Sequence, residues 1–277
     1  MREMVYILMI NQIRSEIMSE LRQLQSTLNK LHLSGISEIV EQTIKDALQQ
    51  KWSYSQLLTY LFSKEMELRS HRKKNLRLLK SNLDPTKTLE LFQFSFNKSV
   101  PERVIKELSQ CQFIESRENV FFVGSSGVGK THLANSIGIE ACRRGFDVLF
   151  KRTTNLLDWL HSGNGDGTFD KKLKRIIKTP LLILDDFGLI QLNNNYQIYL
   201  YEIISQRYET ASTMITSNRD FSEWIEVFDN PLMGSAAMDR LVHKAIKVTI
   251  PGDSFRTHQF KLNQKNIFNI DYKNANK

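Results

Sequence analysis

The chain has 277 residues, of which 41% are apolar and 25% are charged, and its formal net charge is +8 at pH 7. These proportions are typical of a globular protein and exclude a fibrous or low-complexity chain, while the length favours one large domain with a smaller one. The positive charge suits a polyanionic partner without identifying one. Cys111 and Cys142 form neither a C-x-x-C motif nor a Cys/His cluster, so we expect a cytoplasmic protein with no disulfide and no structural zinc.

Helical periodicity dominates the first part of the chain. An apolar stripe with spacings of three and four residues over 13–31 predicts a first helix. Gly35 interrupts the pattern, and we expect Ser37 to begin a second helix and Ser53 a third. The apolar run at 4–10 is too short to span a bilayer, so it is interpreted as the start of an amphipathic helix.

A basic segment follows at 64–80, where seven Lys/Arg residues face only two acids. Helical spacing brings Arg69, Arg72, Lys73 and Arg77 within one face. Such a face is typical of a protein that contacts the phosphate backbone of double-stranded DNA. The alternative interpretation is an ordinary solvated helix face.

The helical region ends at Asp84-Pro85, and residues 91–96 then alternate polar and aromatic side chains. We interpret this stretch as an interdomain linker, which either covers the adenine of a bound nucleotide or packs between the domains. Residues 1–97 are therefore assigned to a helical N-terminal domain and its linker, with expected roles in DNA binding and assembly.

The residues GSSGVGKT at 124–131 match the phosphate-binding loop GxxxxGK[ST] at every fixed position. A β-rich apolar run precedes the loop and a helical segment follows it, so backbone N–H groups and a helix N-terminus would face the phosphates. We expect Lys130 to reach the β- and γ-phosphates of ATP and the Thr131 hydroxyl to bind Mg²⁺. The predicted nucleotide-binding residues are Gly124, Ser125, Ser126, Gly127, Val128, Gly129, Lys130, Thr131 and His132.

Two polar strand ends complete the predicted site. Four apolar residues at 181–184 read as a buried parallel strand and end in Asp185 and Asp186. We expect Asp185 to hold Mg²⁺ and Asp186 to polarise the attacking water, whereas the alternative is a strand that ends in a solvated turn. Asn218 follows the run at 213–216 and is assigned to orient that water, unless it is an ordinary turn residue.

Strand-like and helical segments alternate from 120 to 250, which predicts an α/β fold with a parallel sheet and helices on both faces. The glycine-rich stretch at 161–168 is expected to be a flexible loop. Residues 170–178 carry five Lys/Arg side chains, which either line a DNA-facing surface or form a charged solvent face.

These segments together resemble the IstB-like transposition helper ATPases, an AAA+ group close to the DnaC-type helicase loaders. The resemblance covers nearly the whole chain, and it is most specific after the phosphate loop. The stretches that carry it are GSSGVGKTHLANSIGIEACRRG at 124–145, LLILDDFG at 181–188, TSNRDFSEWIEVFDNP at 216–231, MDRLVHKA at 238–245, GDSFR at 252–256, and KTLELFQFSF at 87–96.

The resemblance implies an AAA+ P-loop ATPase domain at 98–260, with a five-stranded parallel sheet in the order 5-1-4-3-2 and a polar tail at 261–277. It implies ATP and Mg²⁺ as cofactors and slow hydrolysis, because Asp186 replaces the glutamate that is commonest in AAA+ proteins. Arg240 matches the arginine finger that reaches a neighbouring subunit's ATP, with a salt bridge to Asp239 or Glu223 as the alternative. Arg256 is a candidate for a second arginine that senses either the nucleotide or the subunit interface.

The resemblance also implies a function. Dimers or higher rings would form on target DNA with ATP and recruit a partner transposase. A DnaC-like replicative helicase loader is the alternative, and the ATPase core does not separate the two. A third hypothesis, a nucleotide-binding module with no role on DNA, is disfavoured by the basic segment at 64–80.

Overall fold

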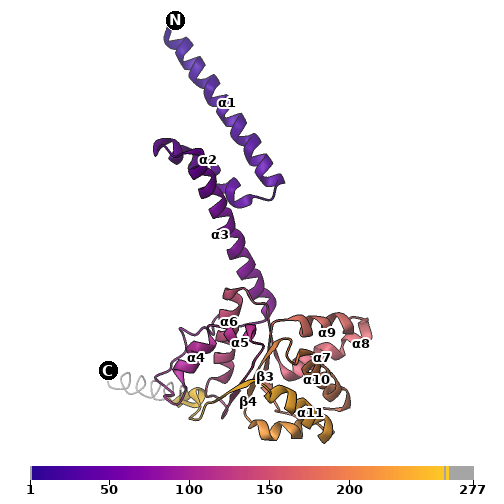
Figure 1. The fold of residues 1–277 in the computed structure, drawn as a ribbon. Helices are drawn as coiled ribbons and strands as arrows, with labels where there is room; N and C mark the ends of the chain where they lie inside the picture. Colours follow the sequence, from indigo (N-terminus) through magenta and orange to yellow (C-terminus); the bar gives the residue numbers. More distant parts are fainter. Residues whose placement is uncertain (1, 259, 262–277) are drawn as a thin grey trace, which may run out of the picture. The chain divides into compact units, whose positions relative to one another are not determined.

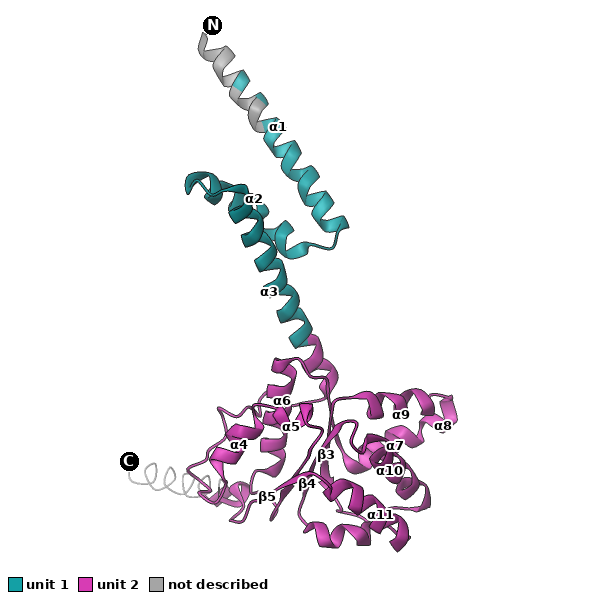
Figure 2. Ribbon diagram, viewed as in Figure 1, with its two compact units in different colours: residues 1–75 teal, residues 76–277 magenta. Residues whose placement is uncertain are grey.

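The computed structural model describes residues 2–258, 260 and 261 and, within the first helix, the side chains of residues 9, 12 and 15 onward. Contacts divide the chain into two compact units, Met1–Asn75 and Leu76–Lys277 (Figure 2). Residues 76–97, which were expected to belong to the N-terminal domain and its linker, pack with the second unit. The predicted tail lies, beyond residue 261, outside the described residues.

The first unit is helical, as predicted. It holds α1 (Arg2–Lys30), α2 (Ser34–Gln49) and most of α3 (Tyr54–Ser81). Its small core is formed by Leu28, Ile36, Val40 and Leu61.

In this unit the start of α3 was predicted from the sequence, whereas the start of α2 was not. Ser53 caps α3, because its hydroxyl accepts a hydrogen bond from the Gln56 backbone N–H at 3.2 Å and the Gln56 side chain accepts one from Ser53. The prediction for α2 was wrong, since this helix begins three residues before Ser37 and includes Gly35. The reason is distant in sequence, because the buried carboxylate of Glu65 accepts a hydrogen bond from Ile36 at the start of α2.

The second unit is built on a parallel sheet. Its strands are β1 (Asn119–Val123), β2 (Val148–Arg152), β3 (Leu181–Phe187), β4 (Ser212–Ser217) and β5 (Ala245–Thr249). They pair in the order β2-β3-β4-β1-β5, and every pairing is parallel. Taken from the β5 edge, this is the predicted order 5-1-4-3-2. Figure 1 shows β3 and β4 at the centre of this unit, with helices around them.

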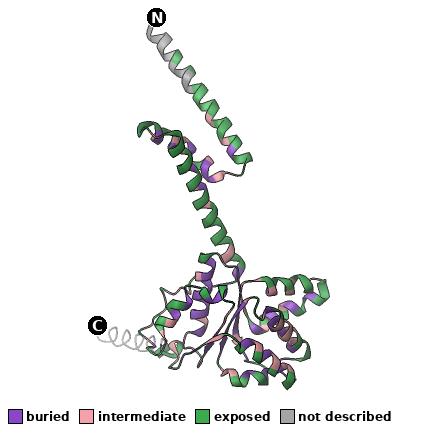
Figure 3. Cartoon of the chain, viewed as in Figure 1, coloured by how far each residue is buried: buried purple, intermediate pink, exposed green. Residues whose placement is uncertain are grey.

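Helices cover both faces of this sheet. On β1, Val120 and Phe122 pack into one core, whereas Phe121 and Val123 pack into the other. The strands of the sheet are mostly coloured as buried (Figure 3). The first face is covered by α4 (Glu102–Leu108), α5 (Gln112–Glu115) and α6 (Lys130–Arg144). The second is covered mainly by α7 (Thr153–His161), α9 (Phe169–Lys178), α10 (Asn194–Arg207), the 3₁₀ helix η1 (Phe221–Val227) and α11 (Pro231–Val242). Because both faces are buried, the functional groups lie at the ends of the strands.

The glycine-rich stretch at 161–168 is not a loop throughout. A short helix, α8 (Gly163–Asp166), forms within it and ends at Gly167, whose φ is +71°. Thr168 closes the turn, since its N–H and hydroxyl both donate to the Asp166 carboxylate.

Arg207, near the end of α10, is an unusual core residue because its side chain is only 2% exposed. Its guanidinium donates hydrogen bonds to the carbonyl oxygens of Ile176 in the last turn of α9, of Thr179 just after this helix, and of Ser212 on β4. This single side chain therefore joins α9, α10 and β4.

Both cysteines are buried free thiols, and burial raises the pKa of Cys111 to about 12 and that of Cys142 to about 11. Within the described ranges, no helix is both long enough and apolar enough to cross a membrane.

Candidate nucleotide-binding and hydrolysis site

The phosphate loop joins the end of β1 to the first turn of α6, as its sequence predicts. Gly124 has a φ of +154°, and a Cβ there would lie 2.1 Å from the carbonyl oxygen of Ile250. Gly129 has a φ of +102°, and a Cβ there would lie 2.7 Å from the ring of Phe92. Both positions therefore require glycine. Gly129 is also the N-cap residue of α6, so the loop lies at the N-terminus of this helix, where the helix dipole favours an anion.

Lys130 is held at the centre of the site. Its ammonium donates to the carbonyl oxygens of Gly124 and Ser125, each at 2.8 Å, and to Oδ1 of Asn218 at 2.6 Å. Burial lowers the pKa of Lys130, while Asp186 and Asp185 act in the opposite direction. The predicted phosphate-binding lysine and the predicted water-orienting amide thus meet, although they are far apart in sequence.

The two predicted metal ligands lie side by side. The Thr131 hydroxyl donates to Oδ1 of Asp185 at 2.8 Å, and the Thr216 hydroxyl donates to the same oxygen. Nowhere in the described chain do three or more His, Cys, Asp or Glu side chains group to hold a metal. One carboxylate with one hydroxyl suits Mg²⁺, which keeps several waters and is bound through few protein ligands and the phosphates.

Asp186 has a strained backbone with a φ of +55°. Its N–H donates to the Thr216 hydroxyl at 3.1 Å, and its carboxylate lies 3.7 Å from Nε of Arg152 on β2. Burial, followed by the neighbouring charge of Asp185, raises the pKa of Asp186, and the cations around it oppose the shift. Neither Thr216 nor Arg152 was identified from the sequence, because a single hydroxyl or cation at a strand end carries no motif.

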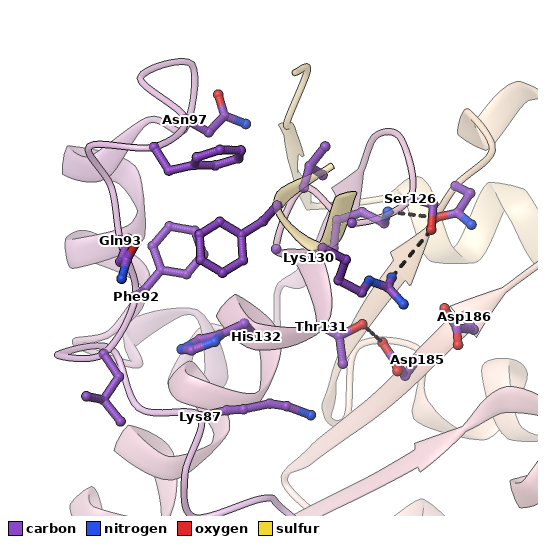
Figure 4. A pocket seen from close by; sticks show the side chains of 18 of the residues that line it. Lys87, Phe92, Gln93, Asn97, Ser126, Lys130, Thr131, His132, Asp185 and Asp186 are labelled. Carbon is purple, nitrogen blue, oxygen red and sulfur yellow. Dashed lines mark hydrogen bonds between the residues drawn. The ribbon is translucent and has the colours of Figure 1, made fainter. Parts of the chain in front are cut away.

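One cavity of about 520 Å³ (Figure 4) is lined by Lys130, Thr131, Arg152, Asp185, Asp186 and Asn218. The stretch at 91–96 forms its opposite wall, where Phe92 packs edge-on against His132 with ring centroids 5.3 Å apart. Phe96 and Phe255 also line it and pack edge-on at 4.9 Å. This wall is apolar and close to the phosphate loop, which favours the interpretation that the stretch covers the adenine.

The segment just before this wall, residues 84–88, is fastened to α6 by hydrogen bonds. Asn135 accepts one from the N–H of Asp84 and donates to the carbonyl oxygens of Asp84 and Lys87. One turn earlier, Nε2 of His132 lies 2.8 Å from the carbonyl oxygen of Thr88. His132 therefore supports the wall in addition to lining the cavity.

The two candidate arginines differ in position. Arg256 lines the cavity and lies 3.4 Å from the Ser126 hydroxyl. Arg240, on α11, is not among the residues that line it; it donates to Tyr201 and to the carbonyl oxygen of Ala236. Among the described residues, no salt bridge joins Arg240 to Asp239 or Glu223, the alternative partners considered from the sequence.

The four predicted DNA-contacting residues do not form one free face. Arg69 pairs with Glu65, Arg72 donates to the Ser34 hydroxyl, and Arg77 lies 3.3 Å from Asp147. Lys73 is exposed, with no hydrogen bond or ion pair to the part of the chain that the structure describes.

Comparison with known proteins identifies the family. Residues 26–263 match the model of the IstB-like ATP binding proteins. The chain belongs to this family. It is 35% identical over 237 residues to the ATP-binding protein of insertion sequence IS5376 from Geobacillus stearothermophilus, an alignment that covers 86% of this chain and 94% of the relative. The ATP-binding protein of insertion sequence IS21 from Pseudomonas aeruginosa is 32% identical over 236 residues, with 85% and 89% covered.

A solved structure supports the assignment of the fold. The replication initiator DnaA, bound to AMPPCP and single-stranded DNA, aligns with a TM-score of 0.51 at 25% identity, over 62% of this chain and 52% of that one. With its phosphate loop and strand order, this IstB-like protein is an α/β AAA+ protein with a helical N-terminal region.

Proposed function

We propose that this IstB-like protein is a Mg²⁺-dependent ATPase that assembles on double-stranded DNA and assists a partner transposase. The observation that carries the ATPase part is the convergence of Lys130, Thr131, Asp185, Asp186 and Asn218 on one cavity. The family name supports ATP as the nucleotide, and the relatives encoded by insertion sequences support a role in transposition.

Each side chain has a part in hydrolysis. ATP enters with its phosphates on the loop, and Lys130 exchanges its contacts with the loop carbonyls for the β- and γ-phosphates. Thr131 and Asp185 are the residues that would hold Mg²⁺, which supplies charge neutralisation on the phosphates. Asp186 accepts a hydrogen bond from the attacking water and Asn218 orients it. The apolar wall with Phe92 covers the adenine.

The position of Arg240, outside its own cavity, supports the assembly part of the proposal. An arginine outside its own cavity can complete the site of a neighbouring subunit, where it stabilises the transition-state charge. Such a finger raises the rate by roughly 10³–10⁵ in proteins that use one.

Titration of duplex DNA with ATP, a non-hydrolysable analogue, ADP or no nucleotide, followed by light scattering, tests this proposal. Large complexes are expected only with the two triphosphates. The Lys130→Ala variant should form none, because its phosphate site is lost, whereas Lys106→Ala, exposed on α4, should behave like the natural protein. DNA binding that is the same with and without nucleotide, or no binding to duplex DNA, would contradict the proposal. The next step would then be a search for a helicase partner.

A further inference from the structure

The exposed face of α9 carries an unbroken row of cations. Lys171, Lys174, Arg175 and Lys178 recur at positions i, i+3, i+4 and i+7 of the helix, and all four are exposed. This spacing places them on one side of the helix, while Ile176 on the other side is fully buried under the sheet.

This row lacks the acidic partners that basic residues have elsewhere in the fold. On α4, Arg103 pairs with Glu107 at 3.0 Å and Lys106 with Glu102 at 2.7 Å, each one helical turn away. On α9 the only acid is Asp170, in the first turn. Across the described residues, none of the four cations in the row forms an ion pair with a carboxylate. Neighbouring like charges destabilise a helix, so the row is explained best by an anion that is bound from outside.

A second group of cations adjoins the row around Trp159 of α7. The charged ends of Lys151 on β2, Lys172 and Arg175 lie 5.1, 5.6 and 5.9 Å from the centre of the indole ring. Lys172 is neutralised in part by Asp166 at 3.7 Å, but no carboxylate is recorded beside Lys151 in the described structure. Burial, followed by the charge of Arg175, lowers the pKa of Lys151. An anion bound here would relieve that repulsion.

The row also continues onto a neighbouring helix. The Arg175 guanidinium donates to the carbonyl oxygen of Lys80, in the last turn of α3, at 3.1 Å. Lys80 itself is exposed and basic, so the positive surface extends beyond α9. Three of the four cations first predicted to contact DNA are engaged within the protein, whereas in the α9 row only the Arg175 side chain donates a hydrogen bond to the described chain, which leaves α9 as the freer basic surface.

We infer that the α9 row, with Lys151 at its edge, binds the phosphate backbone of double-stranded DNA. From Lys171 to Lys178 the helix rises about 10 Å, an axial length that holds about three phosphates of one DNA strand. A line of cations suits a linear polyanion, whereas a single small anion needs donors that converge on one point. The inference rests on the proposed assembly on DNA and assigns that contact to residues.

The test compares two triple variants that remove the same charge. Lys171→Gln/Lys174→Gln/Lys178→Gln removes three cations of the row, and Lys98→Gln/Arg103→Gln/Lys106→Gln removes three exposed cations at and before α4. Duplex binding with the non-hydrolysable ATP analogue is measured by fluorescence anisotropy over a salt series. Nucleotide binding and circular dichroism are measured on both, to show that the fold and the ATP site are intact.

For the α9 variant we expect the affinity at about 100 mM salt to fall roughly ten- to a hundredfold. The slope of log affinity against log salt should decrease in magnitude by about two to three, because each lost phosphate contact removes about 0.9 from that slope. The control variant should keep the natural slope. Replacement of the same three lysines by arginine should preserve binding, since the charges remain.

The outcomes separate this inference from the proposed function. If the natural protein binds no duplex DNA, the proposed function itself fails. If the natural protein binds and the α9 variant binds with the same affinity and salt slope, the α9 assignment is wrong while the proposed function stands. Unchanged DNA binding with lost association to the transposase would assign the row to an acidic protein surface instead.

Discussion

At the scale of single residues, Asp186 combines a strained backbone with a shifted pKa. A residue other than glycine with a positive φ costs on the order of 1–3 kcal/mol and persists where the surroundings impose it. Here the Asp186 N–H is fixed by the Thr216 hydroxyl, which also contacts Asp185. One threonine therefore contacts both aspartates, through the carboxylate of Asp185 and the backbone of Asp186.

We expect Asp186→Asn to reduce ATP hydrolysis by roughly 10²–10⁴ with little change in ATP affinity, because the amide cannot polarise the water as a base. The raised pKa of Asp186 predicts the pH dependence. The active carboxylate form is lost as pH falls through that pKa. The rate should therefore fall on the acid side with an apparent pKa above that of an ordinary aspartate. Stopped-assay phosphate release from pH 4 upward measures it.

Asp229→Asn, at an exposed position after η1, is the matched control and should leave both the rate and the profile unchanged. Full hydrolysis by the Asp186→Asn variant would remove Asp186 from the mechanism and leave Asn218 as the residue that orients the water.

What could be predicted at this scale depended on local pattern. The phosphate loop is contiguous, so its sequence alone indicated Lys130 and Thr131, and Asp185 was evident from the strand that precedes it. Thr216 and Arg152 were missed because only the pairing of β3 with its two neighbours brings them to the carboxylates. The sequence likewise left open whether Phe92 covers adenine, since its partner His132 is forty residues away.

At the scale of elements, Arg207 shows how one buried cation can join several helices and strands. Its donors satisfy carbonyl groups at the end of α9 and on β4 that would otherwise be buried without a partner. A buried carbonyl without a donor costs about 1–3 kcal/mol, and Arg207 serves several of them.

Arg207→Ala is therefore expected to lower the free energy of unfolding by about 3 kcal/mol or more. Arg207→Lys should recover only part of this loss, because an ammonium cannot reproduce the planar, forked donors of the guanidinium. Urea unfolding followed by circular dichroism provides the measurement. Arg117→Ala, which removes one hydrogen bond to an exposed carbonyl of Glu209, should cost no more than about 1 kcal/mol. An equal loss in the two variants would show that Arg207 has no special structural role.

Element boundaries were predicted well where the signal was local and poorly where a distant group decided. The Ser53 cap is local and was found, whereas the early start of α2 depends on Glu65, from another helix. The glycine-rich stretch at 161–168 was interpreted as a loop, yet Asp166 and Thr168 stabilise a turn that ends α8. Composition alone does not reveal such a pairing.

At the scale of the whole molecule, the strand order came from the family resemblance, because alternating strands and helices specify a parallel sheet but not its sequence of neighbours. The boundary at 97 followed the change in composition. The contacts instead assign residues 76–97 to the second unit, since Asn135 and His132 fasten this segment to α6.

The position of Arg240 leads to a prediction about subunits in combination. Arg240→Ala should bind ATP normally but hydrolyse it poorly, and Lys130→Ala should bind none. Mixed on DNA, the two variants should hydrolyse ATP several-fold faster than the sum of the separate samples, because Lys130→Ala subunits supply the finger and Arg240→Ala subunits supply an intact phosphate loop.

The control for this mixture replaces Lys130→Ala by the double variant Lys130→Ala/Arg240→Ala, which offers neither part and should give no recovery. Recovery in the control, or normal hydrolysis by Arg240→Ala alone, would exclude a role for Arg240 between subunits. The readout is phosphate release at fixed total protein.

The burial of the two thiols has a practical consequence for following such subunits. Maleimide dyes react with the thiolate, and the pKa values of about 12 for Cys111 and about 11 for Cys142 keep both native thiols protonated at neutral pH. A cysteine introduced on the surface would therefore take up the dye selectively in the otherwise natural sequence. Two such labelled preparations would report by energy transfer when neighbouring copies come together and when they part.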